Sequence, residues 1–157
     1  MARRIWSRRA LLFCRRSRRS AGFTRALATS RYVALLALLD ADDPEHERAK
    51  TAWDELAEEA TSLVSTNYVV LETVSVAQHR LGFDAVRALV DDILPVIEIR
   101  FVDATVHNAA IATLLAASRR QLSLVDCASF AVMRQGELQR AFAFDKHFRE
   151  RRFTLRS

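Results

Sequence analysis

Residues 62–82, "SLVSTNYVVLETVSVAQHRLG", decide the fold class of this chain. The first five form a short run of apolar, β-branched and small polar side chains, which is typical of a strand. The residues after them predict a helix, which Gly82 closes in the manner of a C-cap. A strand followed directly by a helix is the repeating unit of α/β domains with parallel sheets.

The same alternation continues along most of the chain. Asp103 is expected to cap the helix that begins after it. Short strands alternating with helices predict one α/β domain with a mainly parallel sheet, in which ligands bind at the carboxyl ends of the strands. We expect further helices over 32–39, 46–60, 83–94, 104–120 and 124–135, strands over 96–102, 140–144 and 151–155, and a weaker strand over 23–28.

Charge is distributed very unevenly along the chain. Residues 1–39 carry ten arginines and no acid, so the other 118 residues hold 14 basic and 19 acidic groups, a net charge of −5. The overall charge of +5 therefore belongs to the N-terminal part and says little about a binding face of the domain. Two cysteines are too few for a disulfide framework, so we expect a reducing, cytoplasmic location.

The Arg-rich start has three interpretations. It matches an organellar transit peptide in composition, but we favour a disordered basic extension or a region translated from a wrong start or frame. We divide the chain into an extension over 1–22 and a domain over 23–157. The longest apolar run, "VALLALL", is far shorter than the roughly 20 residues that cross a bilayer, so no membrane partner is expected.

Three acids lie where a purely structural sequence has no need of them. Glu72 interrupts an apolar helix, Asp126 lies in "LSLVDCASFAVM", and Asp145 ends the strand "AFAFD". Taken singly, Glu72 could face solvent, Asp126 could cap a helix and Asp145 could cap a turn. Together they could converge on one edge of a sheet. Converging carboxylates repel unless a divalent cation neutralises them, and hard oxygen ligands select Mg²⁺ or Mn²⁺.

Other catalytic arrangements are missing from the sequence. Its three glycines form no phosphate-binding loop, and no serine lies in a nucleophile-elbow motif. The four histidines lack zinc-type spacing and are expected to be surface or capping residues. The residues alone therefore point to a metal-dependent phosphodiesterase, because bound Mg²⁺ or Mn²⁺ activates water and stabilises a phosphoryl transition state.

Four segments together resemble the PIN domains and, among them, the VapC-type toxin ribonucleases of toxin–antitoxin pairs. The resemblance covers roughly residues 28 to 155, in family order, and the last two segments are the most specific. It implies a three-layer α/β/α fold in which four acids at the carboxyl edge of the sheet hold Mg²⁺ or Mn²⁺ and cut RNA. The segments are "TSRYVALLALLDADDPEHERA", "STNYVVLETVSVAQHRLG", "LSLVDCASFAVMRQ" and "RAFAFDKHF".

The resemblance implies a role for each matching residue. Glu72 corresponds to the second family acid, Asp126 to the third and Asp145 to the fourth, as catalytic residues and metal ligands. Ser129 corresponds to a polar neighbour of the third acid. Asn67 opens the helix that carries the second acid, and we assign it a structural role.

The resemblance fails where the first acid belongs. Where the family pattern reads Asp-Thr-Ser, this chain reads Ala28, Thr29 and Ser30, so the acid is missing and the two hydroxyl residues remain. The resemblance implies that Thr29 and Ser30 contact the substrate or support the metal ligands. The preceding strand "FTRALA" is also poor, because Arg25 interrupts it. An altered frame or recombined start upstream of Thr29 explains both losses, whereas a single Asp→Ala change explains only one.

Three functions follow from this pattern. The first is a VapC-like, metal-dependent endoribonuclease toxin whose activity is impaired by Ala28, with RNA as substrate, a VapB-like antitoxin as partner and a homodimer as the expected assembly. The second is a non-catalytic PIN-like module that keeps antitoxin or RNA binding. The third is a nucleic-acid binder whose Arg-rich start contacts phosphates.

Overall fold

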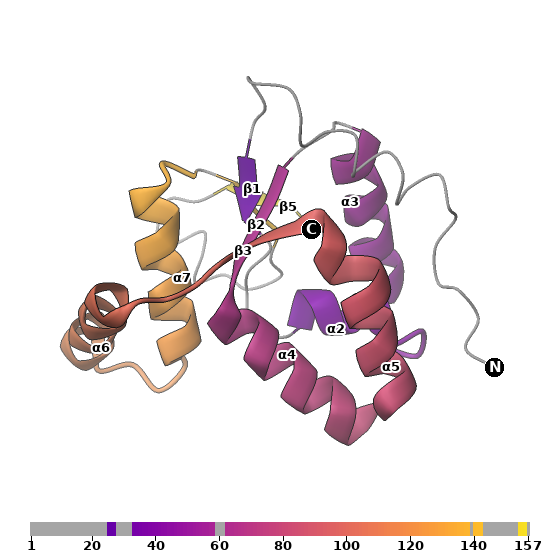
Figure 1. Cartoon of the computed structure of the whole chain (residues 1–157), viewed down its shortest axis with the longest axis horizontal. Coiled ribbons are helices and arrows are strands. Elements are labelled where there is room, and N and C mark those ends of the chain that lie inside the picture. The colour runs from indigo at the N-terminus through magenta and orange to yellow at the C-terminus, as the bar shows by residue number, and fades with distance from the viewer. Residues whose placement is uncertain (1–24, 28–32, 59–61, 139, 143–153, 157) are drawn as a thin grey trace.

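The computed structural model describes residues 25–27, 33–58, 62–138, 140–142 and 154–156 (Figure 1). Its strands form one five-stranded sheet in the order β3-β2-β1-β4-β5, and every neighbouring pair is parallel. The expected parallel sheet is therefore confirmed. The strands are β1 (Arg25–Leu27), β2 (Ser62–Thr66), β3 (Ile97–Arg100), β4 (Arg140–Phe142) and β5 (Thr154–Arg156).

The weak stretch over 23–28 supplies the central strand of this sheet. In β1, Ala26 lies opposite Leu63 of β2 on one side and Arg140 of β4 on the other. β1 ends at Leu27, and the residues that follow it up to Val33 lie outside the part that the structure describes. The arginine in this stretch has therefore not prevented strand pairing.

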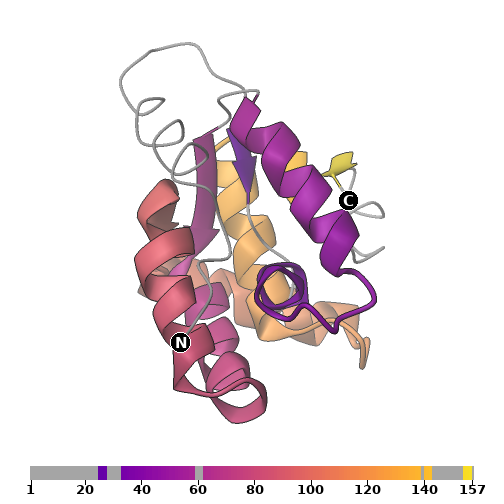
Figure 2. The ribbon, with the colours of Figure 1, turned by 90° about the vertical axis from the view of Figure 1, so that its right-hand side faces the viewer.

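Helices cover both faces of the sheet. Figure 1 shows α6 and α7 on one side of the strands and α3 and α5 on the other, and Figure 2 shows α2, α3 and α5 in front of the strands with α7 behind. The helices are α2 (Val33–Leu39), α3 (His46–Glu58), α4 (Asn67–Arg80), α5 (Phe83–Ala88), α6 (Ala104–Ala117) and α7 (Leu124–Gln135). None of the described helices is long and apolar enough to cross a membrane.

Two adjacent residues of β2 anchor two hydrophobic cores. Leu63 belongs to the cluster built by α2, α3 and the start of β3, whereas Val64 belongs to the cluster built by α6 and α7. Successive side chains of a strand point to opposite faces of the sheet. The two cores therefore lie on opposite faces, which gives the three layers α/β/α that the family resemblance implied.

Two helices end earlier than expected. In the segment expected to be helical over 83–94, the α-helix ends at Ala88. A π-helical turn over Leu89–Ile93 and a 3₁₀ turn over Leu94–Val96 follow it. Pro95 lies in this last turn, and a proline disfavours α-helical geometry in the residue before it. The helix expected over 104–120 stops at Ala117, because Ser118 adopts a left-handed conformation with φ of 46°.

Gly82 closes α4 as the sequence predicted. Its N–H donates to the carbonyl oxygen of Ala77 at 3.0 Å, and its φ is 81°. A glycine adopts this left-handed conformation without the steric cost of a Cβ atom. The chain can therefore reverse direction between α4 and α5 within two residues.

Side-chain contacts hold α4 against the chain that leaves β3. The Oδ1 atom of Asn67 accepts a hydrogen bond from the N–H of Val102 at 2.8 Å, which supports the structural role assigned to Asn67. The Tyr68 hydroxyl lies 2.6 Å from Nδ1 of His107 on α6, and the two rings meet edge to face. His107 is therefore a half-buried partner in a tertiary contact, which the sequence did not predict.

Candidate active site

The start of α7 is fixed by a reciprocal pair of hydrogen bonds. Ser123 is the N-cap residue, and its Oγ accepts from the N–H of Asp126 at 3.0 Å. The Oδ2 atom of Asp126 accepts in turn from the N–H of Ser123 at 2.9 Å. This capping box satisfies two backbone donors that a helix start otherwise leaves without partners. Asp126 is thus the N3 residue of the capping box and not the N-cap considered for it, and this role uses one of its carboxylate oxygens.

The other oxygen of Asp126 faces the protein interior. Asp126 is only 1% exposed, and its Oδ1 atom is buried. A carboxylate is costly to bury, and a cation or hydrogen bonds must compensate for the lost hydration. Because the capping box fixes Oδ2, it also fixes the direction in which Oδ1 points. Asp126 therefore presents a positioned anionic oxygen inside the fold.

Glu72 contributes a second buried carboxylate oxygen. It lies in the second turn of α4, which begins directly after β2, and its side chain is half-buried with Oε2 buried. Glu72 therefore does not simply face solvent, because its Oε2 atom is buried. α4 packs against α7, and Figure 1 shows that both helices begin on the same side of the strands. The carboxyl end of β2 leads straight into that side.

Ser129 places a hydroxyl on the same face of α7 as Asp126. The two residues are three positions apart, and residues at that spacing are neighbours on a helix surface. Ser129 is 1% exposed, and its Oγ has no hydrogen-bond partner in the described part of the chain. Buried hydroxyls are normally hydrogen-bonded, so an orphaned one indicates a group that binds there or lies outside the described residues.

Thr66 is a contributor that the sequence analysis missed. It is fully buried at the end of β2, and its hydroxyl accepts from the N–H of Val69 at 3.2 Å, which makes it the N-cap of α4. The available signal was a threonine directly before a helical pattern, which is a preferred N-cap. Thr66 therefore sets where α4 begins and, through the helix, where Glu72 lies.

The remaining expected site residues lie outside the described part of the chain. This holds for Thr29, Ser30 and Asp145, and also for Ala28. Within the described ranges, His, Cys, Asp and Glu side chains do not form a group of three that could hold a metal ion. The structure thus places two acids and one serine of the expected set, all on α4 and α7.

Known proteins are similar to this chain in both fold and sequence. Residues 33–153 match the PIN domain family. The chain belongs to the PIN domain family. Its sequence is 34% identical over 113 residues to the 23S rRNA-specific endonuclease VapC20 of Mycobacterium tuberculosis, in strains CDC 1551 / Oshkosh and ATCC 25618 / H37Rv. Each alignment covers 71% of this chain and 84% of the relative.

A solved structure agrees with the sequence comparison. The crystal structure of Mycobacterium tuberculosis VapC20, a toxin that cleaves the Sarcin-Ricin loop, matches this PIN domain with a TM-score of 0.70 and 32% sequence identity. The match covers 82% of this chain and 96% of the VapC20 chain. The expected PIN fold and VapC type are confirmed. The chain is a VapC-type PIN domain, and it therefore belongs to a class of endoribonuclease toxins.

The orphaned hydroxyl of Ser129 gives a stability prediction. Ser129→Ala should change the free energy of unfolding by less than about 0.5 kcal/mol, because it removes no intramolecular hydrogen bond of the described fold. Ser123→Ala is the matched control on the same helix and should cost about 1 kcal/mol, because it removes the N-cap. Urea unfolding followed by circular dichroism measures both. A larger loss for Ser129→Ala than for Ser123→Ala would show that Ser129 has a structural role.

Proposed function

We propose that this PIN domain is a Mg²⁺- or Mn²⁺-dependent endoribonuclease whose turnover is impaired by Ala28. The observation that carries the proposal is the buried Oδ1 atom of Asp126, which the capping box orients toward the interior. Glu72 on the neighbouring helix adds a second buried carboxylate oxygen. Two such oxygens at the same side of a parallel sheet favour a site for a hard cation.

The donor set fits such a cation. Carboxylate and hydroxyl oxygens are the ligands that Mg²⁺ and Mn²⁺ prefer, whereas zinc sites use histidine and cysteine. Glu72 and Asp126 would hold the ion, and Asp145 would complete the set in the way that the family resemblance implies. The orphaned Oγ of Ser129 offers a further polar atom beside Asp126, for a ligand water or for a neighbouring carboxylate. The described residues alone provide an incomplete set, which implies weak binding.

The protein's own contribution to the reaction is positioning. The capping box holds the Asp126 carboxylate in one rotamer, so little entropy is lost when it binds a cation. Thr66 fixes the first turn of α4 and thereby the placement of Glu72. When bound, Mg²⁺ or Mn²⁺ activates water and stabilises the charge that develops on a phosphate during hydrolysis. The parallel sheet and its two cores keep these groups at one edge.

Ala28 is the reason to propose impairment. It follows β1, the central strand, and occupies the position at which the family pattern has its first acid. Losing a carboxylate that binds the metal directly weakens both affinity and geometry, and even losses in the surrounding shell cost about 10- to 100-fold. This departure is also what favours the second candidate, a non-catalytic PIN module that binds RNA or antitoxin without turnover.

The substrate and partners are proposed from the relatives. VapC20 is named as a 23S rRNA-specific endonuclease, so ribosomal RNA is the first substrate class to test. A VapB-like antitoxin and a homodimer are the proposed partners, in the cytoplasm. Three large apolar side chains, on α4, after β3 and on α6, are exposed and are the first positions to test for a partner contact. They are Leu71, Phe101 and Leu115, which are 68%, 79% and 70% exposed.

Metal binding gives the first test of this proposal. Isothermal titration calorimetry of the purified chain with Mn²⁺ should show weak binding. Asp126→Asn should reduce the Mn²⁺ affinity at least about tenfold, the lower range for a perturbed metal shell. The amide still accepts the hydrogen bond from Ser123 through its oxygen but carries no charge. Asp103→Asn, which alters an N-cap of α6, is the control and should bind Mn²⁺ like the parent. If Asp126→Asn binds Mn²⁺ as tightly as the parent chain does, the assignment of Asp126 as a metal ligand is wrong.

Ala28→Asp tests the proposed impairment. Restoring the missing carboxylate should raise Mg²⁺-dependent cleavage of single-stranded RNA by at least about tenfold, and expression should arrest growth. Ala28→Asn has similar volume without the charge and should restore little, because neutralising a divalent cation needs anionic oxygen. Two results contradict the proposal: robust metal-dependent cleavage by the parent chain, or no gain from Ala28→Asp in a folded protein. The second result would favour the non-catalytic module.

A further inference from the structure

A long acid-free segment runs through an otherwise acidic domain. Residues 40–157 carry a net charge of −5, yet Ala104 to Val125 contain two arginines and no acid. Both arginines, Arg119 and Arg120, lie in the connection between α6 and α7, and both are exposed. This connection is therefore a positively charged segment in a domain whose net charge is negative.

The connection is an ordered turn. Ser118 ends α6 in a left-handed conformation, with its N–H donating to the carbonyl oxygen of Leu114 at 3.2 Å. The N–H of Leu122 donates to the carbonyl oxygen of Arg119 at 3.2 Å, and the Leu122 side chain is 6% exposed in the core that α6 and α7 share. The backbone that carries the arginines is therefore fixed at both ends.

The same turn leads directly into the acidic site. Ser123, the N-cap of α7, follows Leu122, and its capping box holds Asp126. Arg120 and Ser123 are three residues apart, at most about 11 Å in an extended chain, and Asp126 lies about 4.5 Å further along the helix. The Cα atoms of Arg120 and Asp126 are therefore within about 15 Å of each other.

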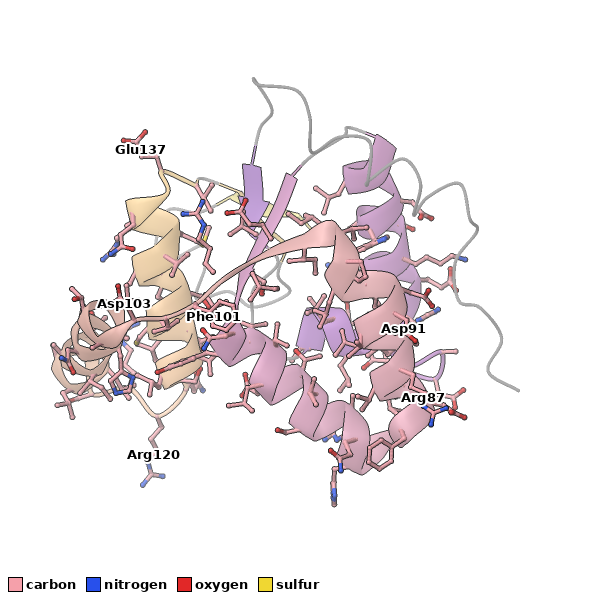
Figure 3. The ribbon with its side chains drawn as sticks, in the orientation of Figure 1. Arg87, Asp91, Phe101, Asp103, Arg120 and Glu137 are labelled. Atoms are coloured by element: carbon pink, nitrogen blue, oxygen red, sulfur yellow. The ribbon has the colours of Figure 1, made fainter. Side chains whose placement is uncertain are left out.

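Arg120 is available for a ligand. It makes no hydrogen bond or ion pair with any residue that the structure describes. Figure 3 shows its side chain extending from the turn below α7, away from the body of the protein. A guanidinium group offers a planar set of donors that matches the oxygens of a phosphate.

The structure assigns Arg119 and Arg120 as a phosphate-binding subsite, which holds the RNA backbone one or a few nucleotides from the bond that the acidic site would cut. This inference rests on the proposed function and adds to it a direction for the bound strand, along the α6–α7 turn. The arginines are positioning residues, since they would act on the RNA chain at a distance from the reacting phosphate. The acidic site itself repels RNA, so a nearby cationic turn supplies attraction that the carboxylates cannot.

Binding of an end-labelled single-stranded oligoribonucleotide to the full chain tests the subsite without requiring turnover. Fluorescence anisotropy over a series of salt concentrations should show that Arg119→Gln/Arg120→Gln weakens binding about tenfold at low salt. The slope of log affinity against log salt should become shallower by about 0.7 for each arginine that contacts a phosphate. Arg119→Lys/Arg120→Lys retains the charges and should restore the slope.

The matched control removes two charges elsewhere. Arg80→Gln/Arg87→Gln alters exposed arginines of α4 and α5, and Figure 3 shows Arg87 on the opposite side of the molecule from Arg120. This variant should bind RNA like the parent. Equal losses in the two Gln variants, or an unchanged slope in Arg119→Gln/Arg120→Gln, would overturn the subsite while leaving the proposed function in place. A parent chain that binds no RNA would overturn both.

Discussion

The capping box between Ser123 and Asp126 is the interaction on which the candidate site depends. It starts α7 at Leu124, and it commits one oxygen of Asp126 to the backbone so that the other is held inside the fold. A helix N-terminus also attracts negative charge, so an acid is a favourable residue in the first turn of α7. One side chain therefore stabilises the start of α7 and holds a carboxylate oxygen inside the fold.

The sheet explains why a second acid lies on the same side. β2 contributes Leu63 to one core and Val64 to the other, so the strand is held from both faces. It then passes through Thr66, which caps α4, and the helix carries Glu72. A parallel sheet directs all of its carboxyl ends to one edge, which is why residues distant in sequence can meet there. The candidate site therefore depends on the parallel strand order as well as on the acids themselves.

The sequence predicted the parts of the fold that have strong local signals. β2 and α7 have the expected bounds. A short stretch of apolar and β-branched residues marks the strand, and in the structure Ser123 caps the start of the helix and Gly136 its end. The ends of α5 and α6 were misjudged. Pro95 acts on the turn before it, and Ser118 adopts a left-handed conformation that few residues other than glycine favour.

Tertiary contacts were beyond a local analysis of the sequence. No pattern in the sequence pairs Tyr68 with His107, which are 39 residues apart. Asp126 and Glu72 stood out because each acid interrupts an apolar run, and their positions in the predicted α/β pattern suggested one shared site. The family resemblance added the role expected of each acid. The residues expected to complete it, Ala28, Thr29, Ser30 and Asp145, lie outside the described residues, so their placement stays a prediction.

Crystallography in the presence of Mn²⁺ tests the central claim most directly. Diffraction data collected near the manganese absorption edge locate the ion by its anomalous signal. The account predicts a peak beside Oδ1 of Asp126 and Oε2 of Glu72, with Mn–O distances of roughly 2.0–2.4 Å, the range for hard divalent cations on oxygen ligands. A peak elsewhere on the protein, or none at saturating Mn²⁺ in well-ordered crystals, would contradict it.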